Sequence, residues 1–446
     1  MNVSDEVRRA YKSDSVQKTL VLTFPELSLT IPTSEVYAES MNLYESILEN
    51  TSIEFVGCIS SKFEVQIRNN ATYQKVLKGK RIEATIYTEG TEDEPIPLFK
   101  GIVDEAKKET GKNFIKITAY DILYKCGQVE VANWYNNLHF PITLGALRRS
   151  LLSYIHLPYV ESTLPNDSVV INKQYEPKTL QSLVVLKSLC QINGCFGIVN
   201  RDGLFEFRYL KQTVNALYPS LALFPSYDIF PGGSSESPYR NSEIMGYYRL
   251  VEYQDFEVKP VDKVTIRESE TDTGVTYGSG ENNYIIQANM FAYKLSTQVL
   301  KNIAREIYMK VQNITYYPYL STNNGLPYAE CGVDAVSFYY LDAQQATQSM
   351  DFYIFNRKLT GIQALKDNFE SKGEEYQNEF ITDINARLQT IQTKQDTSSK
   401  DYDYKFEEYD SDWDNLYGTF GGQEVMVVVN WDASTGILET SSTMLS

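Results

Sequence analysis

Ile115-Lys116-Ile117-Thr118-Ala119-Tyr120-Asp121 alternates apolar and polar side chains over its first five residues and ends in a polar pair. A strand with a period of two buries one face and leaves the other in water, which is typical of antiparallel sheets and barrels. Three earlier segments have similar strand patterns: Leu20–Phe24, Phe63–Ile67 and Ile82–Ile86. Because turn residues separate these short segments, we predict a β-barrel or sandwich over roughly residues 15–125.

Helical patterns lie on both sides of this strand region. Residues 1–14 have the pattern of a short helix. Further along, Thr143–Leu152 and Lys178–Cys190 repeat apolar residues at helical spacing. The second of these helices ends at Asn193-Gly194, which is a favourable helix C-cap. The next two strand patterns, on either side of Asp202-Gly203, predict a hairpin, so residues 126–215 should form a small α+β unit.

The second half of the chain repeats the mixture of strands and helices. Residues 224–240 have the composition of an irregular loop. The longest helical pattern is Gln287–Lys310. Strand patterns are found at Val261–Arg267, Ala335–Tyr340 and Phe352–Phe355, and the last of these is followed by Lys358-Leu359-Thr360-Gly361.

The chain becomes strongly acidic after Gly361. Residues 363–415 contain 14 Asp/Glu and 6 Lys/Arg. Within them Ile381, Ile384, Leu388 and Ile391 are spaced 3-4-3, which is the seam spacing of a coiled coil. Two interpretations remain open, a short helical bundle with other copies of the chain and a single surface helix packed on its own domain.

Composition limits the classes of partner. The chain has 41 Lys/Arg and 58 Asp/Glu, a net charge of −17, and no basic cluster in the sequence. Nucleic-acid binding draws much of its affinity from basic groups, so we expect no tight binding of DNA. An acidic surface would instead let DNA slide past without sticking. No segment is apolar over the length that a membrane span needs. The five cysteines are odd in number and contain no Cys-x-x-Cys pair, which favours reduced core thiols.

Residues with catalytic or metal-binding potential are sparse and poorly arranged. The two histidines, His139 and His156, have no Cys or carboxylate at zinc-ligand spacing. Gly278-Ser279-Gly280 lacks the frame of a nucleophile elbow. Asp410–Asn415 imitates the start of a calcium loop but lacks its glycine and its final glutamate. We therefore predict no catalytic, cofactor-binding or metal-binding residues and no cofactor, although a carboxylate pair formed by folding is not excluded by sequence.

The order of these elements resembles the phage baseplate hub and tail-associated (tail tip) protein family, which is related to the spike carriers of contractile injection systems. The resemblance covers about residues 15–395. It rests on six short segments in a characteristic order. In Pro327–Val336, Val333 separates the Gly and Asp that are adjacent in the family. These segments are Leu98–Asp104 with its Gly-x-Val, Ile115–Asp121, Tyr316-Tyr317-Pro318-Tyr319, Pro327–Val336, Leu359-Thr360-Gly361 and Ser371–Glu374.

The resemblance implies a fold and a set of partners. It implies an α+β, mainly β chain with two β-barrel tube domains, an inserted small α+β domain and a C-terminal helix. It also implies a homotrimeric ring that continues the tail tube, attaches a central tip, spike or fibre, and takes part in genome ejection. The implied partners are a distal tail or tail-tube protein above, the tape measure protein, and passing DNA without specific binding. The implied location is the distal end of the phage tail in the virion, after assembly in the host cytoplasm.

Six segments follow from pattern and resemblance together. In the last of them, Val425, Val427 and Val429 belong to an apolar, β-prone run, which we expect to pair either within the chain or with a partner strand. The segments are 1–125 (helix and first barrel), 126–215 (inserted α+β domain), 216–285 (loop-rich β region), 286–365 (long helix and second barrel), 366–396 (helix, possible trimeric coiled coil) and 397–446 (acidic tail with the β-prone run).

Two other functions compete with the structural one. A receptor- or carbohydrate-binding tail-tip module would cluster exposed aromatic residues, for which Trp134-Tyr135 and Trp413 are the candidates. A cell-wall-degrading tail enzyme would need convergent carboxylates or a histidine with a shifted pKa. Hydrolysis of purified peptidoglycan distinguishes the enzyme from both non-enzymatic alternatives.

Overall fold

The computed structural model describes most of the chain. The chain divides into two compact units, Met1–Ile384 and Asn385–Ser446, which are treated separately below. The predicted loop at 224–240 and the acidic residues 397–415 lie outside the described residues. The described residues are 3–13, 15–48, 57–69, 76–108, 111–173, 176–210, 248–269, 271–341, 347–373, 380–383, 418–420, 423–432 and 437–444.

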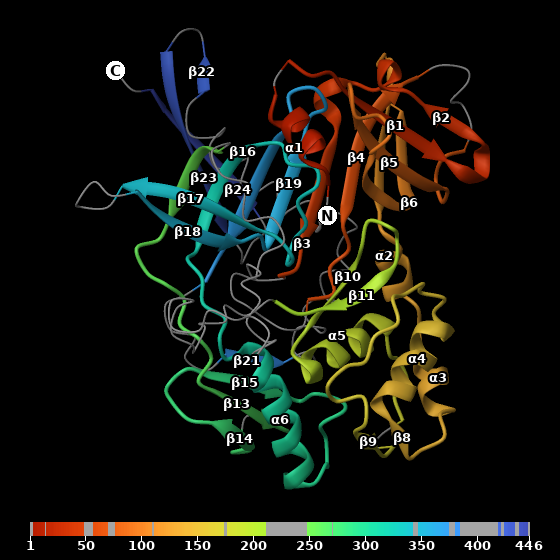
Figure 1. Cartoon of the computed structure of the whole chain (residues 1–446), viewed down its shortest axis with the longest axis vertical. Coiled ribbons are helices and arrows are strands. Elements are labelled where there is room, and N and C mark those ends of the chain that lie inside the picture. The colour runs from red at the N-terminus through yellow and green to blue at the C-terminus, as the bar shows by residue number, and fades with distance from the viewer. Residues whose placement is uncertain are drawn as a thin grey trace, which may run out of the picture. The chain divides into compact units, whose positions relative to one another are not determined.

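Strands dominate the first unit, and eleven of them form a single sheet (Figure 1). Their order is β12-β16-β20-β19-β3-β4-β7-β6-β5-β1-β2, and every neighbouring pair is antiparallel. The strands are β1 Lys18–Phe24, β2 Leu29–Ile31, β3 Asn42–Ser46, β4 Lys62–Arg68, β5 Arg81–Thr88, β6 Ile96–Lys108, β7 Phe114–Tyr120, β12 Tyr248–Tyr253, β16 Tyr319–Asn324, β19 Asn356–Thr360 and β20 Lys366–Ser371.

The predicted alternation is confirmed along these strands. In β4, Phe63, Val65 and Ile67 are fully buried, whereas the residues between them are partly exposed. The mainly β class is therefore confirmed, but the division into two barrel domains is not, because strands of both halves share one sheet. The N-terminal half curls. A β-bulge interrupts the β6–β7 ladder between Val103 and Glu105, and Val36, beyond β2, returns to bridge Ile67.

Helix α1 (Asp5–Lys12) precedes the sheet, as the sequence predicts. Ser4 caps it, because its side-chain oxygen accepts a hydrogen bond from the Val7 N–H at 3.2 Å. Val7 and Tyr11 are buried, and the Tyr11 ring meets Tyr328 edge-on with 6.3 Å between ring centres. Three short 3₁₀ turns lie between β1 and β3: η1 Pro25–Leu27, η2 Thr33–Glu35 and η3 Ala38–Ser40.

A small α+β unit follows β7, and its predicted helices and hairpin are confirmed. Asp121 caps its first helix, because its carboxylate accepts the Leu123 N–H at 3.0 Å. The last helix ends at Gly194, whose φ of 63° is the left-handed conformation that favours glycine. Its elements are α2 Ile122–Gly127, α3 Ala132–Asn136, β8 Ile142–Thr143, α4 Leu144–Tyr154, β9 Val170–Ile171, α5 Ser182–Asn193, β10 Phe196–Val199 and β11 Phe205–Arg208.

A second sheet has the order β14-β13-β15-β21, and α6 packs on β13 and β14. The helix predicted over Gln287–Lys310 is shorter than expected. It begins after the cap Ser296, whereas Gln287 ends a strand, since the apolar residues there are buried in a sheet. The elements are β13 Lys263–Arg267, β14 Val275–Gly278, β15 Asn283–Gln287, α6 Thr297–Val311 and β21 Phe380–Asp383.

The helix predicted over 366–396 is wrong in its described parts. Residues 366–371 form β20, in which buried Asp367 and Phe369 alternate with exposed neighbours, a period of two. Residues 380–383 form β21, which pairs in parallel with β15 and places Ile381 opposite Ile285. The 3-4-3 spacing that starts at Ile381 therefore does not describe a continuous helical seam.

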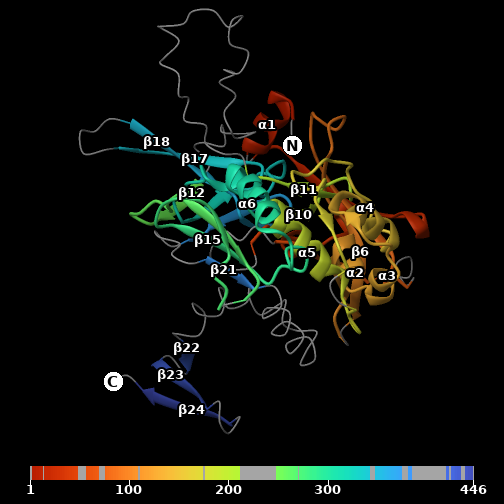
Figure 2. The same cartoon turned by 90° about the horizontal axis from the view of Figure 1, so that it is seen from below.

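Two further groups of strands complete the description. The hairpin of β17 (Ala335–Leu341) and β18 (Thr347–Tyr353) extends away from the neighbouring strands in both views (Figures 1 and 2). The second unit contains a three-stranded sheet of β22 (Gly418–Phe420), β23 (Gln423–Asp432) and β24 (Ile437–Met444), in that order. Among the described residues, no helix is both long and apolar enough to cross a membrane.

Candidate functional site

The two halves of the chain are joined where β3 pairs with β19. Five consecutive residue pairs form this antiparallel ladder, from Asn42 opposite Thr360 to Ser46 opposite Asn356. We call this ladder the seam. On the other side of β3 the sheet continues to β4, where Tyr44 lies opposite Lys62. The seam therefore makes one surface out of strands that are more than 300 positions apart in the sequence.

The outer face at the seam is polar and places an aromatic ring between two cations. Tyr44 lies directly opposite Lys358 on β19 and Lys62 on β4. The ammonium nitrogens lie 5.5 Å and 5.6 Å from the centre of the Tyr44 ring, respectively. Cations at this distance are attracted by the ring quadrupole, with about 0.5–1 kcal/mol at an exposed site. The arrangement stabilises the seam from the outside.

The outer face of the five strands β20, β19, β3, β4 and β7 carries more basic than acidic residues. Their outward positions hold five Lys/Arg and two Glu, in a chain that is acidic as a whole. Glu64 is shared by two of the cations, Lys62 at 3.3 Å and Lys116 at 3.7 Å. The basic residues are Lys62, Arg68, Lys116, Lys358 and Lys366, and the acidic residues are Glu64 and Glu370.

The inner face behind the seam contains a buried ion pair. Arg357 on β19 donates two hydrogen bonds to the Asp367 carboxylate on β20, at 2.9 Å and 2.7 Å, and both side chains are fully buried. Arg357 also donates to Glu45 of β3 at 2.9 Å. Burial lowers the pKa of Arg357, but the Asp367 and Glu45 charges raise it above its usual value, so the guanidinium stays charged.

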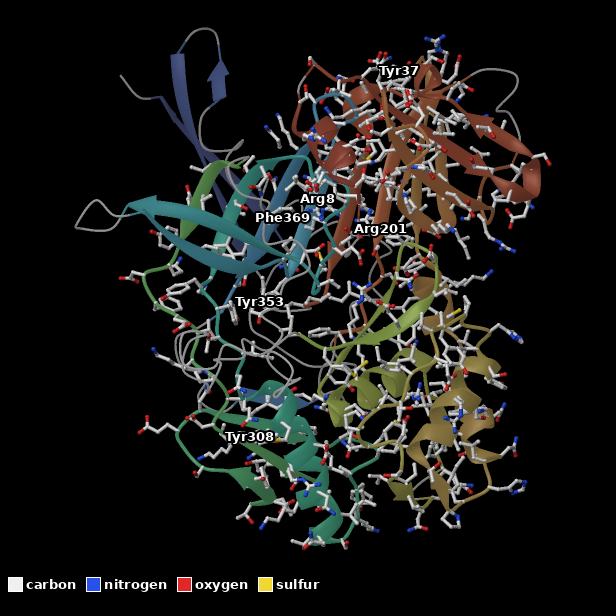
Figure 3. The ribbon with its side chains drawn as sticks, viewed as in Figure 1. Arg8, Tyr37, Arg201, Tyr308, Tyr353 and Phe369 are labelled. Atoms are coloured by element: carbon white, nitrogen blue, oxygen red, sulfur yellow. The ribbon has the colours of Figure 1, made fainter. Side chains whose placement is uncertain are left out.

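Two further arginines extend this cluster to the α+β unit. Arg201, in the turn of the β10–β11 hairpin, donates to the carbonyls of Ala329 at 2.7 Å and Pro97 at 3.0 Å (Figure 3). Arg208 on β11 donates to Glu330 at 3.0 Å. We call Glu45, Arg201, Arg208, Glu330, Arg357 and Asp367 the ion cluster.

A small cavity lies beside the ion cluster, and the cluster holds the hairpin against the sheet. The cavity has a volume of about 30 Å³ and is lined in part by Glu45, Arg201 and Arg208. This is room for about one water molecule and not for a metabolite. Burial raises the pKa of Glu330, but nearby positive charges that include Arg208 and Arg201 lower it to about 2, so this carboxylate is charged at neutral pH. The ion cluster therefore suits a structural role, in which it holds the β10–β11 hairpin against the sheet.

The cysteines are all buried and unpaired by disulfides. The sulfurs of Cys58 and Cys190 are 3.5 Å apart. Burial raises the pKa of Cys190 well above its usual value, and hydrogen bonds with the other thiols act in the same direction. Thiols of this kind react slowly, because the thiolate is the nucleophile. Within the described part of the chain, no group of three His, Cys, Asp or Glu residues is placed to hold a metal ion.

The structure describes only some of the residues that the sequence predicts at subunit or partner interfaces. Ile381 lies in β21, and Ile384, Leu388 and Ile391 lie outside the described residues. In β23, the backbone of Val425 pairs with Met444, that of Val427 with Ser442 and that of Val429 with Thr440. The apolar run therefore forms the central strand of a sheet within its own chain.

The ion cluster was missed by sequence reasoning. Arg357 and Asp367 both occupy the apolar phase of an alternating strand, next to buried Leu359 and Phe369. A charged residue at such a position was the available signal, since a buried charge requires a partner. The partner Glu45 is far away in the sequence, so the pattern alone does not identify it.

Comparisons with known proteins give low-identity structural matches. No family model and no curated protein matches the sequence. The 43 kDa tail protein of prophage MuSo2 from Shewanella oneidensis is 10% identical, with a TM-score of 0.48 over 79% of this chain and 97% of that one. A tail protein from Neisseria meningitidis is 10% identical, with a TM-score of 0.45 over 82% and 99%. Prophage tail protein gp18 from Listeria monocytogenes is 12% identical, with a TM-score of 0.45 over 80% and 95%. All three are named as tail proteins, the class that the sequence resembles.

Proposed function

We propose that this chain is a structural subunit of a phage tail tip or baseplate hub and that its 11-stranded sheet forms part of a tube wall. The observation that carries the proposal is the continuous antiparallel sheet across the seam, which has one polar outer face and one packed inner face. A wall between an aqueous channel and a protein core needs such a two-sided sheet. The order of sequence motifs supports the same role.

In this role the chain forms a homotrimeric ring. Among the strands that the structure describes, β12 stands at one end of the sheet order, and an edge strand is a template for a further strand. Leu250 on β12 and Leu320 on β16 are 52% and 36% exposed, which suits a contact with a neighbouring copy. A closed ring of copies covers such edges by symmetry. The ring continues the tail tube from the tube or distal tail protein and meets the tape measure, spike or fibre proteins at the tip.

The ring also provides the path for genome ejection. The chain assembles in the host cytoplasm and remains at the distal end of the tail in the virion. DNA passes through the channel without sequence-specific binding.

The mass in solution and the position in the particle test this proposal. We expect light scattering to give three chains per particle and images to show the protein in a ring at the tail tip. Leu250→Glu should weaken trimer formation, because it places a charge at the edge. Met309→Glu is the matched control, since Met309 is 51% exposed on α6, away from the edge. A stable monomer that is absent from ring-shaped assemblies would overturn the proposal.

We also propose that the C-terminal sheet attaches the next tip component. In the described part of the second unit, β24 is the outer strand of that sheet and pairs with β23 alone. An added strand from a partner would extend the sheet there. Deletion of residues 420–446 should leave the trimer intact and reduce attachment of the tip. Unchanged attachment in purified particles would reject the partner role of this segment.

A further inference from the structure

The outer face of β20, β19, β3, β4 and β7 differs in charge from the chain that contains it. The whole chain carries a net charge of −17, whereas this face holds five basic and two acidic residues. We call it the basic face. Because the sequence contains no cluster of Lys and Arg, it predicts a channel wall without clustered positive charges. Folding instead gathers lysines from distant segments onto one side of the sheet.

Exposure differs among the charged side chains of this face. Lys116 is 48% exposed and Arg68 is 56% exposed, whereas Lys62 is 12%, Glu64 is 14% and Glu370 is 20% exposed. Lys366 is exposed as well. A ligand that approaches this face therefore meets Lys116, Arg68 and Lys366 before it meets the two carboxylates.

The chemistry of the face favours a polyanion over a protein partner. Among the described residues, none of the large exposed hydrophobic side chains lies on these five strands. Protein interfaces have an apolar, aromatic-rich centre, whereas nucleic-acid interfaces are polar and positively charged. Five strands at about 4.8 Å spacing span about 19 Å, which is wide enough to meet several phosphates at once.

We propose that the basic face contacts the phosphates of passing DNA, weakly and without sequence preference. This inference rests on the proposed function. Lys62 and Lys116 both form ion pairs with Glu64, and Lys62 and Lys358 lie on either side of the Tyr44 ring. These three cations, and Arg68 beside Glu35 at 3.8 Å, therefore have a partner in the protein to which they return, so a phosphate contact is brief and the duplex is guided without being held. At low salt the net charge of −17 also repels DNA and limits the affinity. At 0.1 M salt the Debye length is about 10 Å, so acidic groups farther than this from the duplex are largely screened.

Lysine footprinting on the full-length protein tests the contact directly. The protein is acetylated with and without a DNA duplex of about 20 base pairs, and each lysine is read by mass spectrometry. We expect DNA to protect Lys116, Lys358 and Lys366, and to leave Lys301 and Lys310 on α6 unprotected. Equal protection at both sets, or none at either, would overturn the proposal.

Binding measurements on a charge-matched pair of variants give the second test. The triple variant Lys116→Gln/Lys358→Gln/Lys366→Gln and the control Lys301→Gln/Arg305→Gln/Lys310→Gln change net charge equally. We expect fluorescence anisotropy to give the wild type a Kd of about 10⁻⁴ M at physiological salt and tighter binding at low salt. The first variant should weaken binding about tenfold or more and flatten the salt dependence, and the control should bind like the wild type.

Two outcomes of these measurements separate the possible failures. If a poly-glutamate peptide of equal charge protects the same lysines as well as DNA does, the favoured occupant is an acidic protein segment and the DNA proposal is wrong. If DNA does not bind while the protein still forms rings at the tail tip, this inference fails and the proposed function stands. A monomer that never enters a tail would instead remove the proposed function itself.

Discussion

Arg357 and Asp367 form a fully buried bidentate ion pair between neighbouring strands, with N–O distances of 2.9 Å and 2.7 Å. The pair links β19 to β20, and Glu45 adds β3 from the other half of the chain. The carbonyl of Leu326 accepts a further hydrogen bond from Arg357 at 2.7 Å. Every nitrogen of the Arg357 guanidinium donates to an acceptor. Since these acceptors come from both halves of the chain, the bonds specify how the two halves of the sheet join.

Arg357→Met should destabilise the protein severely. The substitution leaves the Asp367 carboxylate buried without its counter-charge, and breaking a buried pair in this way costs about 3–5 kcal/mol. The free energy of unfolding from chemical denaturation measures the loss. Lys358→Met, at the adjacent outward position, should cost about 1 kcal/mol or less. Equal losses in the two variants would show that the buried pair has no special role, and Arg357→Met/Asp367→Leu should recover part of the stability.

Asp121 should make stability depend on pH near neutrality. Burial raises the pKa of Asp121 to about 7, although hydrogen bonds from the Ser61 and Leu123 N–H groups lower it. The folded state then binds the proton more tightly than the unfolded state, whose aspartate pKa is about 3.9. The contribution of this group is complete below about pH 4 and is lost as pH rises through 7.

Asp121→Asn should remove that dependence, because the amide stays neutral at every pH. Relative to the wild type, the variant should gain stability between pH 4 and pH 8, on the order of 4 kcal/mol at most. Unfolding curves at several pH values test this expectation. Asp104→Asn on β6 is the control, since Asp104 is exposed, and its difference from the wild type should stay flat. A flat difference for Asp121→Asn as well would mean that Asp121 is charged in the fold at every pH tested.

The five cysteines should be reduced and unreactive in the native protein. Burial raises the pKa of Cys126 to about 11, although Lys125 lowers it, and all five thiols are buried. A colourimetric thiol reagent should react slowly with the folded chain and should report five thiols after denaturation. Rapid reaction of one or more thiols before unfolding would contradict this packing.

Gly101→Ala should destabilise the sheet at the β6–β7 ladder. A Cβ atom at this position would lie 2.3 Å from the Tyr120 carbonyl oxygen and 2.4 Å from the Phe99 ring. Because a backbone oxygen cannot move aside cheaply, we expect a loss of about 1–3 kcal/mol by thermal unfolding. Gly127→Ala on α2 provides the comparison, since its nearest neighbour would be Leu183 at 3.4 Å, an ordinary contact. Similar melting temperatures for the two variants would argue against the clash.

Local patterns predicted the local elements correctly. The alternation in Ile115–Ala119 became β7, and the turn at Asp202-Gly203 joins β10 to β11. The Asn193-Gly194 pair ends α5, as expected. Each of these features depends on residues within a few positions of one another, so the information lies in one short stretch. The Gly-x-Val motif also acquires a physical reason, because Gly101 has no room for a side chain.

Predictions failed where distant segments decided the structure. Ile381 had helical spacing, but its backbone pairs with Ile285, nearly a hundred positions earlier in the chain. The division into two barrels is not confirmed, because β3 pairs with β19 and joins strands of both halves in one sheet. The candidate site was not predicted at all, because its members come from four separate parts of the sequence.

The sequence by itself determined many of the local strands, helices and turns, because hydrophobic period and turn chemistry act between neighbouring residues. Only the tertiary structure decided that Glu45, Arg357 and Asp367 are buried together and that lysines collect on one face of an acidic chain. The physical reason is that strand register sets which distant residues meet, and register follows from packing across the whole sheet.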